Sequence, residues 1–238
     1  MGEGAPSQKT SAAGKPEPLA EGGFVFHRPF TVVAILVAAL LVVPAALAVR
    51  VHVRVEGKTR TIFAATAPLV DVTSPRANPL PENALDSLAT ASFLGEFYYH
   101  VTDTSFGPYI DQVGRYPAEG QTGWVFKVNG KSPPVGANQA LLKTGDNVLW
   151  YWAQFGVAGG PKTLVLSRVG KANRGCYRVH AQDDNGSLTP ALGAVLRVGG
   201  RTVRTQGSTQ AAVGCVGKHR GLLVRAELGG AVRSNALP

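Results

Sequence analysis

GWVFKVNGKSPPVGANQALLKTGDNVLWYW, residues Gly123–Trp152, is the stretch that decides the fold. Its two ends are apolar and aromatic runs typical of β-strands. Asn129-Gly130 follows the first run, and this dipeptide is a strong hairpin signal because both central residues of the turn need φ > 0. A second turn signal lies at residues 144–146, just before the last run. The stretch therefore predicts two strands that pair within one sheet.

The residues before this stretch complete an α+β pattern. Residues 51–55 alternate apolar and polar side chains and residues 60–64 return after a turn, which predicts a hairpin. Asn83 is a suitable N-cap for a helix of about ten residues, and Gly95 is expected to end it. Further strands are expected at 97–101 and 109–113. The helix side chains expected against the sheet are Leu85, Leu88, Ala89 and Phe93.

After residue 154 the pattern changes. Residues 155–161, FGVAGGP, have the composition of a linker. From there on, short strands alternate with turn signals such as those at 184–186 and 199–200, which predicts a small β-sandwich. The expected organisation is a disordered lead at 1–28, a signal peptide or transmembrane anchor at 29–49, an α+β domain at 50–154, a linker at 155–161 and a basic β-sandwich at 162–238.

Residues 29–49 form a run of 21 residues without a charged side chain, long enough to cross a hydrocarbon core of about 30 Å. Two interpretations stay open. A cleaved signal peptide explains the small residues of Ala46-Leu47-Ala48 and the helix-weakening Pro44. An uncleaved anchor explains the long polar lead of residues 1–28. Either interpretation predicts that the rest of the chain lies in the cell envelope, outside the cytoplasm.

The formal net charge of +9 is unevenly distributed. Residues 1–48 and 49–159 are each neutral in formal charge, so residues 160–238 carry the whole excess. A basic domain of this kind indicates contact with an anionic surface or, equally, an ordinary solvated domain. The candidate contact residues of one expected hairpin are Arg197, Arg201 and Arg204. Outside the cell the natural anionic partners are wall polymers and lipid headgroups. Tyr177 is the one aromatic residue after the linker, which argues against nucleic-acid binding.

Residues 83–152 resemble the bacterial domain of unknown function 4430 (DUF4430), which is related to the C-terminal domain of transcobalamin and intrinsic factor. The matching segments are Ala84–Leu88, Phe106–Ile110, Gly123–Lys131, Val135–Ala137, Gly145-Asp146 and Leu149-Trp150. The resemblance implies a β-grasp-like sheet, completed by the hairpin at 51–64, in an exported ligand-binding module. In the cobalamin carriers a large helical domain shares the ligand, and this sequence contains no counterpart of it. The C-terminal region is more loosely similar to Ig-like or prealbumin-like modules.

Strand alternation assigns side chains to the two faces of the sheet. The core residues expected under the helix are Trp124, Phe126, Phe97 and Tyr99. The opposite, open face is expected to carry Tyr98, His100, Lys127 and Tyr151, because an unpaired lysine is costly to bury. Such a face can hold a flat or polar ligand, or it is an ordinary solvated surface. Trp152 is either a stacking platform or part of the domain junction, whereas Trp150 is expected in the core.

Cys176 and Cys215 are the only cysteines, and both lie in expected strands of the second domain. An even number of cysteines outside the cytoplasm favours a disulfide over two buried thiols. Closing such a loop stabilises the fold by ~4 kcal/mol on chain-entropy grounds.

The sequence carries no recognisable catalytic motif. The five histidines lack metal-ligand spacing and there is no Gly-x-Ser-x-Gly. Asn129–Ser132 lacks the first glycine of a phosphate loop, and residues 183–186 lack the alternating ligands of a calcium loop. We therefore expect no enzyme, no metal and no cofactor. The favoured function is binding of a small ligand or surface partner by an exported or membrane-anchored protein. The alternatives are a structural envelope component and, least favoured, an enzyme.

Overall fold

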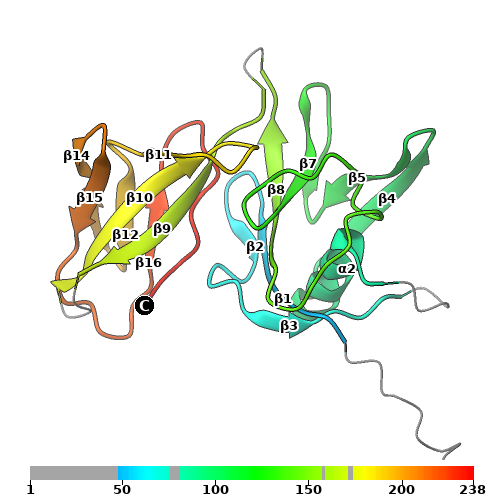
Figure 1. Ribbon diagram of the computed structural model, residues 1–238, viewed down its shortest axis with the longest axis horizontal. Helices are drawn as coiled ribbons and strands as arrows, with labels where there is room; N and C mark the ends of the chain where they lie inside the picture. Colours follow the sequence, from blue (N-terminus) through cyan, green and yellow to red (C-terminus); the bar gives the residue numbers. More distant parts are fainter. Residues whose placement is uncertain (1–47, 76–80, 157–158, 171–173) are drawn as a thin grey trace, which may run out of the picture. The chain divides into compact units, whose positions relative to one another are not determined.

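The computed structural model describes residues 48–75, 81–156, 159–170 and 174–238. These residues are mostly β-strand with one α-helix, arranged in several sheets (Figure 1). The expectations for the lead at 1–28 and for the membrane segment at 29–49 fall almost wholly outside this range. No helix among the described residues is long and apolar enough to cross a membrane.

The first sheet has the order β2-β1-β8-β7, and β3 also pairs with β1. β1 and β8 run parallel, whereas the remaining pairs are antiparallel. Asn129 and Gly130 have φ of 51° and 81°, so the turn after β7 has the predicted left-handed conformation. The strands of this sheet are β1 (Arg50–Glu56), β2 (Thr61–Phe63), β3 (Leu69–Asp71), β7 (Thr122–Val128) and β8 (Asn147–Gln154).

One helix, α2 (Ala84–Gly95), packs on this sheet against β1, β2 and β8. Asn83 caps it as predicted: the Asn83 side chain accepts from the amide of Asp86, and the Asp86 carboxylate accepts from the amide of Asn83. The expected end is off by one residue, because the left-handed cap falls on Glu96 and Gly95 is still helical.

The buried face of α2 is centred on Ala84, Leu88 and Ala91. Phe93 lies on the other side of the helix, five residues beyond Leu88, and is 84% exposed. The prediction that Phe93 faces the sheet is therefore wrong. Trp124 and Trp150 are buried in the core between helix and sheet. The other side chains expected in this core, Phe97, Tyr99 and Phe126, pack against it while partly exposed.

A separate small sheet contains β4 (Tyr99–Thr104), β5 (Gly107–Val113) and β6 (Tyr116–Pro117). It follows α2 in the chain, and its strands are antiparallel. The strand expected at 97–101 begins two residues later than predicted. We call residues 48–156 the first lobe.

Residues 159–238, the second lobe, form two sheets that enclose one apolar core. Leu164 and Tyr177 from the first of these sheets meet Leu196 and Val224 from the second. The larger sheet contains β9 (Thr163–Val169), β10 (Cys176–Gln182), β11 (Leu188–Pro190), β14 (Gln206–Ser208) and β15 (Ala211–Cys215). The smaller contains β12 (Val195–Val198), β13 (Arg201–Arg204) and β16 (Val224–Glu227). Both lobes lie within one compact unit. No sheet of the described residues includes strands of both, and the names β-grasp-like and Ig-like stay predictions.

Candidate functional site

The face of the first sheet that lies away from α2 borders a cavity of about 550 Å³. The pairing register puts His52 and Arg54 of β1, Leu149 of β8 and Lys127 of β7 on this face. Residues of the second lobe, among them Thr163, close the opposite side of the cavity. The face predicted to be open is therefore covered, and what it offers a ligand is a partly open space with a mixed polar and apolar wall.

Lys127 is the candidate residue that the structure places in this cavity wall, and its side chain is fully buried. Its Nζ donates to the carbonyl oxygens of Asp183 (2.8 Å) and Gln182 (3.3 Å) and to Thr163 Oγ1 (3.3 Å). A carboxylate oxygen of Asp184 lies 3.3 Å from Nζ. Burial lowers the pKa of Lys127, partly offset by Asp184. The expectation of a solvated Lys127 is wrong, because a neighbouring loop supplies the partners that burial requires.

Tyr151 is also buried rather than open to solvent. It forms a small apolar cluster with Ala153 and Val232, the latter from the C-terminal segment. Burial and the nearby Asp184 carboxylate raise the pKa of its hydroxyl. The Lys127 ammonium lies 5.9 Å from the centre of the Tyr151 ring. The prediction that Tyr151 lies on an open face is therefore wrong for the same reason as for Lys127: the second lobe covers this side of the sheet.

Tyr98 and His100 are exposed, as expected, but they lie in and before β4 of the small sheet and do not line this cavity. Their rings stack with centroids 6.4 Å apart. His100 Nδ1 lies 2.7 Å from a carboxylate oxygen of Asp111 on β5. A hydrogen bond from Thr102, together with the contact to His100, lowers the pKa of Asp111. Of the four candidates Tyr98, His100, Lys127 and Tyr151, only Lys127 lines this cavity, so they do not form one site.

Trp152 lies on the helix side of the sheet, in register with Trp124, and lines a second cavity of about 430 Å³. The Lys58 ammonium lies 4.9 Å from the centre of a Trp152 ring. Val232 and Arg233 of the second lobe share this cavity, so Trp152 lies where the two lobes meet. This is the second of the two positions expected for it.

Glu56, which was not predicted as a site residue, is fully buried between three arginines. Arg54 of the same strand lies 3.1 Å from its carboxylate, and Arg233 of the second lobe lies 3.2 Å from it. Arg225 of β16 also pairs with it and donates to Thr61. Alternation along residues 53–56 was the sequence signal that could have indicated this pair. It puts Arg54 and Glu56 on one face of the strand and Val53 and Val55 on the other.

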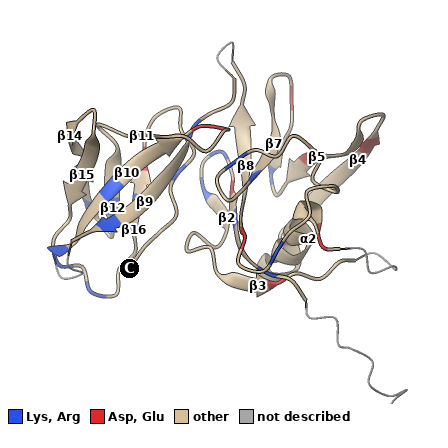
Figure 2. Cartoon of the chain, in the orientation of Figure 1, with Lys and Arg blue, Asp and Glu red and all other residues tan. Residues whose placement is uncertain are grey.

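The candidate anion-contact arginines lie on one hairpin, as expected, but not on one face. Arg197 and Arg204 share a face of β12 and β13, and Arg197 pairs with the Glu227 carboxylate at 2.5 Å. Arg201 lies on the other face and donates to the carbonyl oxygens of Val216 and Lys218. Figure 2 shows the basic residues on several strands of the second lobe. Arg204 likewise donates to a backbone carbonyl oxygen, that of Gly193, at 3.4 Å. Contact with an anionic surface therefore stays a prediction for all three arginines.

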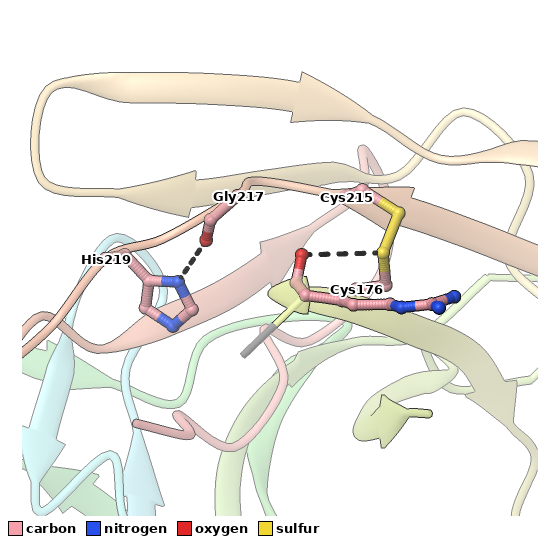
Figure 3. Close-up of a disulfide and its surroundings, with 5 residues drawn as sticks. Cys176, Cys215, Gly217 and His219 are labelled. Carbon is pink, nitrogen blue, oxygen red and sulfur yellow. Dashed lines mark hydrogen bonds between the residues drawn. A yellow bond between two sulfur atoms is a disulfide. The ribbon is translucent and has the colours of Figure 1, made fainter. Parts of the chain in front are cut away.

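Cys176 and Cys215 form the predicted disulfide between β10 and β15 (Figure 3). Figure 3 also shows His219, whose Nδ1 donates to the carbonyl oxygen of Gly217 at 2.7 Å. Its Nε2 pairs with the Tyr177 hydroxyl at 2.8 Å. These contacts assign a structural role to the ring. Among the described residues no three His, Cys, Asp or Glu side chains are grouped to hold a metal ion.

Comparison with known proteins bears out the resemblance of the first lobe. Residues 82–154 match the family described as domain of unknown function DUF4430. Among solved structures, haptocorrin in complex with Cbi is 20% identical with a TM-score of 0.36, over 44% of this chain and 25% of haptocorrin. A candidate metal binding protein from Ruminococcus gnavus ATCC 29149 is 14% identical with a TM-score of 0.33, over 44% of this chain and 97% of that protein. No curated protein matches the chain.

Proposed function

We propose that this chain is an exported or membrane-anchored, non-enzymatic surface protein that binds a small ligand, and that the cavity over β1, β7 and β8 is its binding site. The observation that carries this proposal is the cavity itself. Its volume of about 550 Å³ lies within the range of small-molecule sites. The DUF4430-like module supplies one wall and the second lobe the other, so both parts of the chain take part in binding.

The cavity wall supports binding rather than mere packing. Arg54 is 7% exposed and His52 is half-buried, so both offer polar groups where little water competes. Thr66 and Asn147 line the same cavity and are exposed. A few placed polar groups in a concave, partly apolar wall are typical of ligand sites.

Two observations support export. The Cys176–Cys215 disulfide is of the kind that persists in oxidising compartments. Residues 29–49 supply an uncharged run of membrane-spanning length before the first strand. A protease added to intact cells that express the full-length chain should digest residues 50–238. Protection of the whole chain from protease until the cells are lysed would reject export.

Native mass spectrometry of the full-length chain, purified from the envelope of cells that express it, tests ligand binding. We expect a small molecule to co-purify and to be lost from Asn147→Trp, which places a bulky ring at the cavity rim. Val135→Trp is the matched control, because Val135 is 42% exposed and lies outside the cavity. Equal retention in both variants, or no binding in wild type across a broad ligand screen, would reject the cavity as the binding site.

The charge of the second lobe favours a second candidate function. Residues 160–238 carry the whole net charge of +9, and the Arg197 side chain is 55% exposed. A structural envelope component would use this surface on anionic wall polymer or lipid. It should sediment with anionic vesicles, and this binding should weaken as salt rises. Sedimentation that is absent or independent of salt would remove this candidate.

A further inference from the structure

The charges around the covered sheet face do not balance. One carboxylate, that of Glu56, is shared by the guanidinium groups of Arg54, Arg225 and Arg233. The side chain of Glu56 is 0% exposed, and those of the three arginines are 8%, 18% and 15% exposed. Within these ion pairs two positive charges are therefore in excess in a region with little access to water, and the Glu227 carboxylate, which is itself paired with Arg197, also acts on Arg225. Buried charge of this kind is costly unless a partner of opposite sign is present.

Arg54 is the member of this cluster that lines the 550 Å³ cavity. Its Nη1 donates to Glu56 (3.1 Å) and to the carbonyl oxygen of Arg233 (2.8 Å). Its Nε and Nη2 make no hydrogen bond to any described residue. Every fully buried side-chain nitrogen or oxygen of the described residues has a hydrogen-bond partner. Because these two nitrogens have none, they are not fully buried and retain contact with solvent. Two donors of a largely buried cation that lines the cavity are thus not used by the described residues.

The rest of the lining favours an anion. Lys127 is the other cation of the cavity wall, and its ammonium is already paired with Asp184 and backbone oxygens. No aspartate or glutamate among the described residues lines the cavity. Burial lowers the pKa of Arg54 to about 10, and its two arginine neighbours act in the same direction, against the opposing effect of Glu56. An anion beside Arg54 would relieve this repulsion.

His52 lies two residues before Arg54 on the same face of β1. Its Nδ1 donates to the carbonyl oxygen of Ala67 at 2.8 Å, which leaves Nε2 free to meet a ligand. Thr66 and Asn147 provide a hydroxyl and an amide at the rim. A single inorganic anion would fill a small part of 550 Å³. The remaining space is bordered by these polar groups and by apolar side chains such as Leu149 and Leu164.

We propose that the ligand is an anionic, hydroxyl-rich small molecule of the sugar-phosphate class, with its phosphate on Arg54 Nε and Nη2 and its hydroxyls toward His52, Thr66 and Asn147. This assignment rests on the proposed function, because it specifies the chemistry of the same cavity. Guanidinium and phosphate form paired, charge-assisted hydrogen bonds, which makes Arg54 the group that selects for charge.

Isothermal titration calorimetry of the full-length chain at constant ionic strength tests the assignment. The probes are inorganic phosphate, a panel of hexose phosphates and the matching uncharged hexoses. We expect at least one hexose phosphate to bind more than tenfold more tightly than both its free hexose and inorganic phosphate. Arg54→Gln should weaken that binding at least tenfold. Arg60→Gln, an equal charge change at an exposed position of the same lobe, should change it less than twofold.

Arg54→Gln removes part of a buried cluster, so its folding is checked by circular dichroism. If it fails to fold, the histidine side-chain NMR signals of wild type provide the second measurement, and the His52 signal should shift on titration with the hexose phosphate. An unmoved His52 signal, equal binding of charged and uncharged hexoses, or no binding by any hexose phosphate would overturn the assignment. One outcome separates the two proposals: a neutral molecule co-purifies, is lost from Asn147→Trp and is kept by Arg54→Gln. That result would support the cavity as the binding site and reject an anionic ligand.

Discussion

The ammonium of Lys127 is buried and fully partnered, so its removal has a predictable cost. Lys127→Met removes the lysine donor from the carbonyl oxygens of Gln182 and Asp183 and from the hydroxyl of Thr163, although the Asp183 carbonyl oxygen keeps the amide of Gly186. We expect a loss of about 2 kcal/mol in the free energy of unfolding, since each buried acceptor left unpaired costs roughly 1–3 kcal/mol and some regain water. Urea denaturation of the full chain measures it. Lys143→Met, at an exposed position, should change it by less than ~0.5 kcal/mol, and equal losses would contradict the role given to Lys127.

The free energy of unfolding should depend on pH through the single side chain of His180. Burial, and to a smaller extent Arg178, lower its pKa below the ordinary value of 6.5. As the pH falls below 6.5 the unfolded chain therefore takes up the proton before the folded chain does. The contribution of His180 to stability is then lost progressively down to its folded pKa. Thermal unfolding between pH 7 and pH 5, compared for wild type and His180→Gln, should show a smaller decrease in the variant. The same decrease in both would contradict the assignment.

The start of helix α2 is determined by its local sequence, above all by the capping residue Asn83. Asn83 is 2% exposed, caps the amide of Asp86 and also donates to the carbonyl oxygen of Asn138. Asn83→Ala should lower the free energy of unfolding by about 1–2 kcal/mol, because a cap and a buried partner are lost together. Asn83→Asp retains the capping oxygen and should lose less. Chemical denaturation monitored by circular dichroism distinguishes them, and equal stability of the alanine variant and wild type would contradict the capping role.

Elements with strong local chemistry could be predicted from the sequence. Asn129-Gly130 defines the turn after β7 through its backbone preference, and Asn83 defines the start of α2 through its side chain. Phe93 was misplaced because helical spacing alone does not say which of two apolar stripes the sheet covers. Short strands such as β11 and β14 could not be predicted, since three-residue strands held mainly by a neighbour carry little pattern of their own.

The candidate site could be predicted only in part, because the side-chain directions are local but the covering of the sheet face is not. Alternation correctly separated Trp124 from Lys127 across the sheet, because side-chain direction is a local property. Whether a face is open is not local: it depends on Thr163, Asp183 and Val232, which lie far along the chain. The sequence therefore predicts Arg54 as a polar strand residue and Glu56 as the start of a turn. In the structure Glu56 is still in the strand, and Arg54, Arg225 and Arg233 enclose it.

At the scale of the whole molecule, Glu56 links the lobes. Its carboxylate belongs to β1 of the first lobe, whereas Arg225 and Arg233 belong to the second. The Arg233 guanidinium also donates to the carbonyl oxygens of Gly57 and Lys58, so the same contact fixes the end of β1. Cooperative unfolding of the two lobes should therefore depend on this one carboxylate more than on any exposed ion pair.

Glu56→Gln tests this dependence. The variant leaves the three guanidinium groups without their shared anion, and removing one partner of a buried ion pair typically costs about 3–5 kcal/mol. Tryptophan fluorescence reports mainly the first lobe, because all three tryptophans belong to it and only Trp152 also borders the second lobe. Circular dichroism reports both lobes. In wild type the two transitions should coincide, and in Glu56→Gln they should separate.

Glu227→Gln is the matched control, because its pair with Arg197 is 55% and 36% exposed and should be worth less than ~1 kcal/mol. Its two transitions should stay together. If Glu56→Gln is as stable and as cooperative as this control, then Glu56 does not couple the lobes. The cavity between them would then need another source of rigidity to hold Arg54 and His52 in place for a ligand.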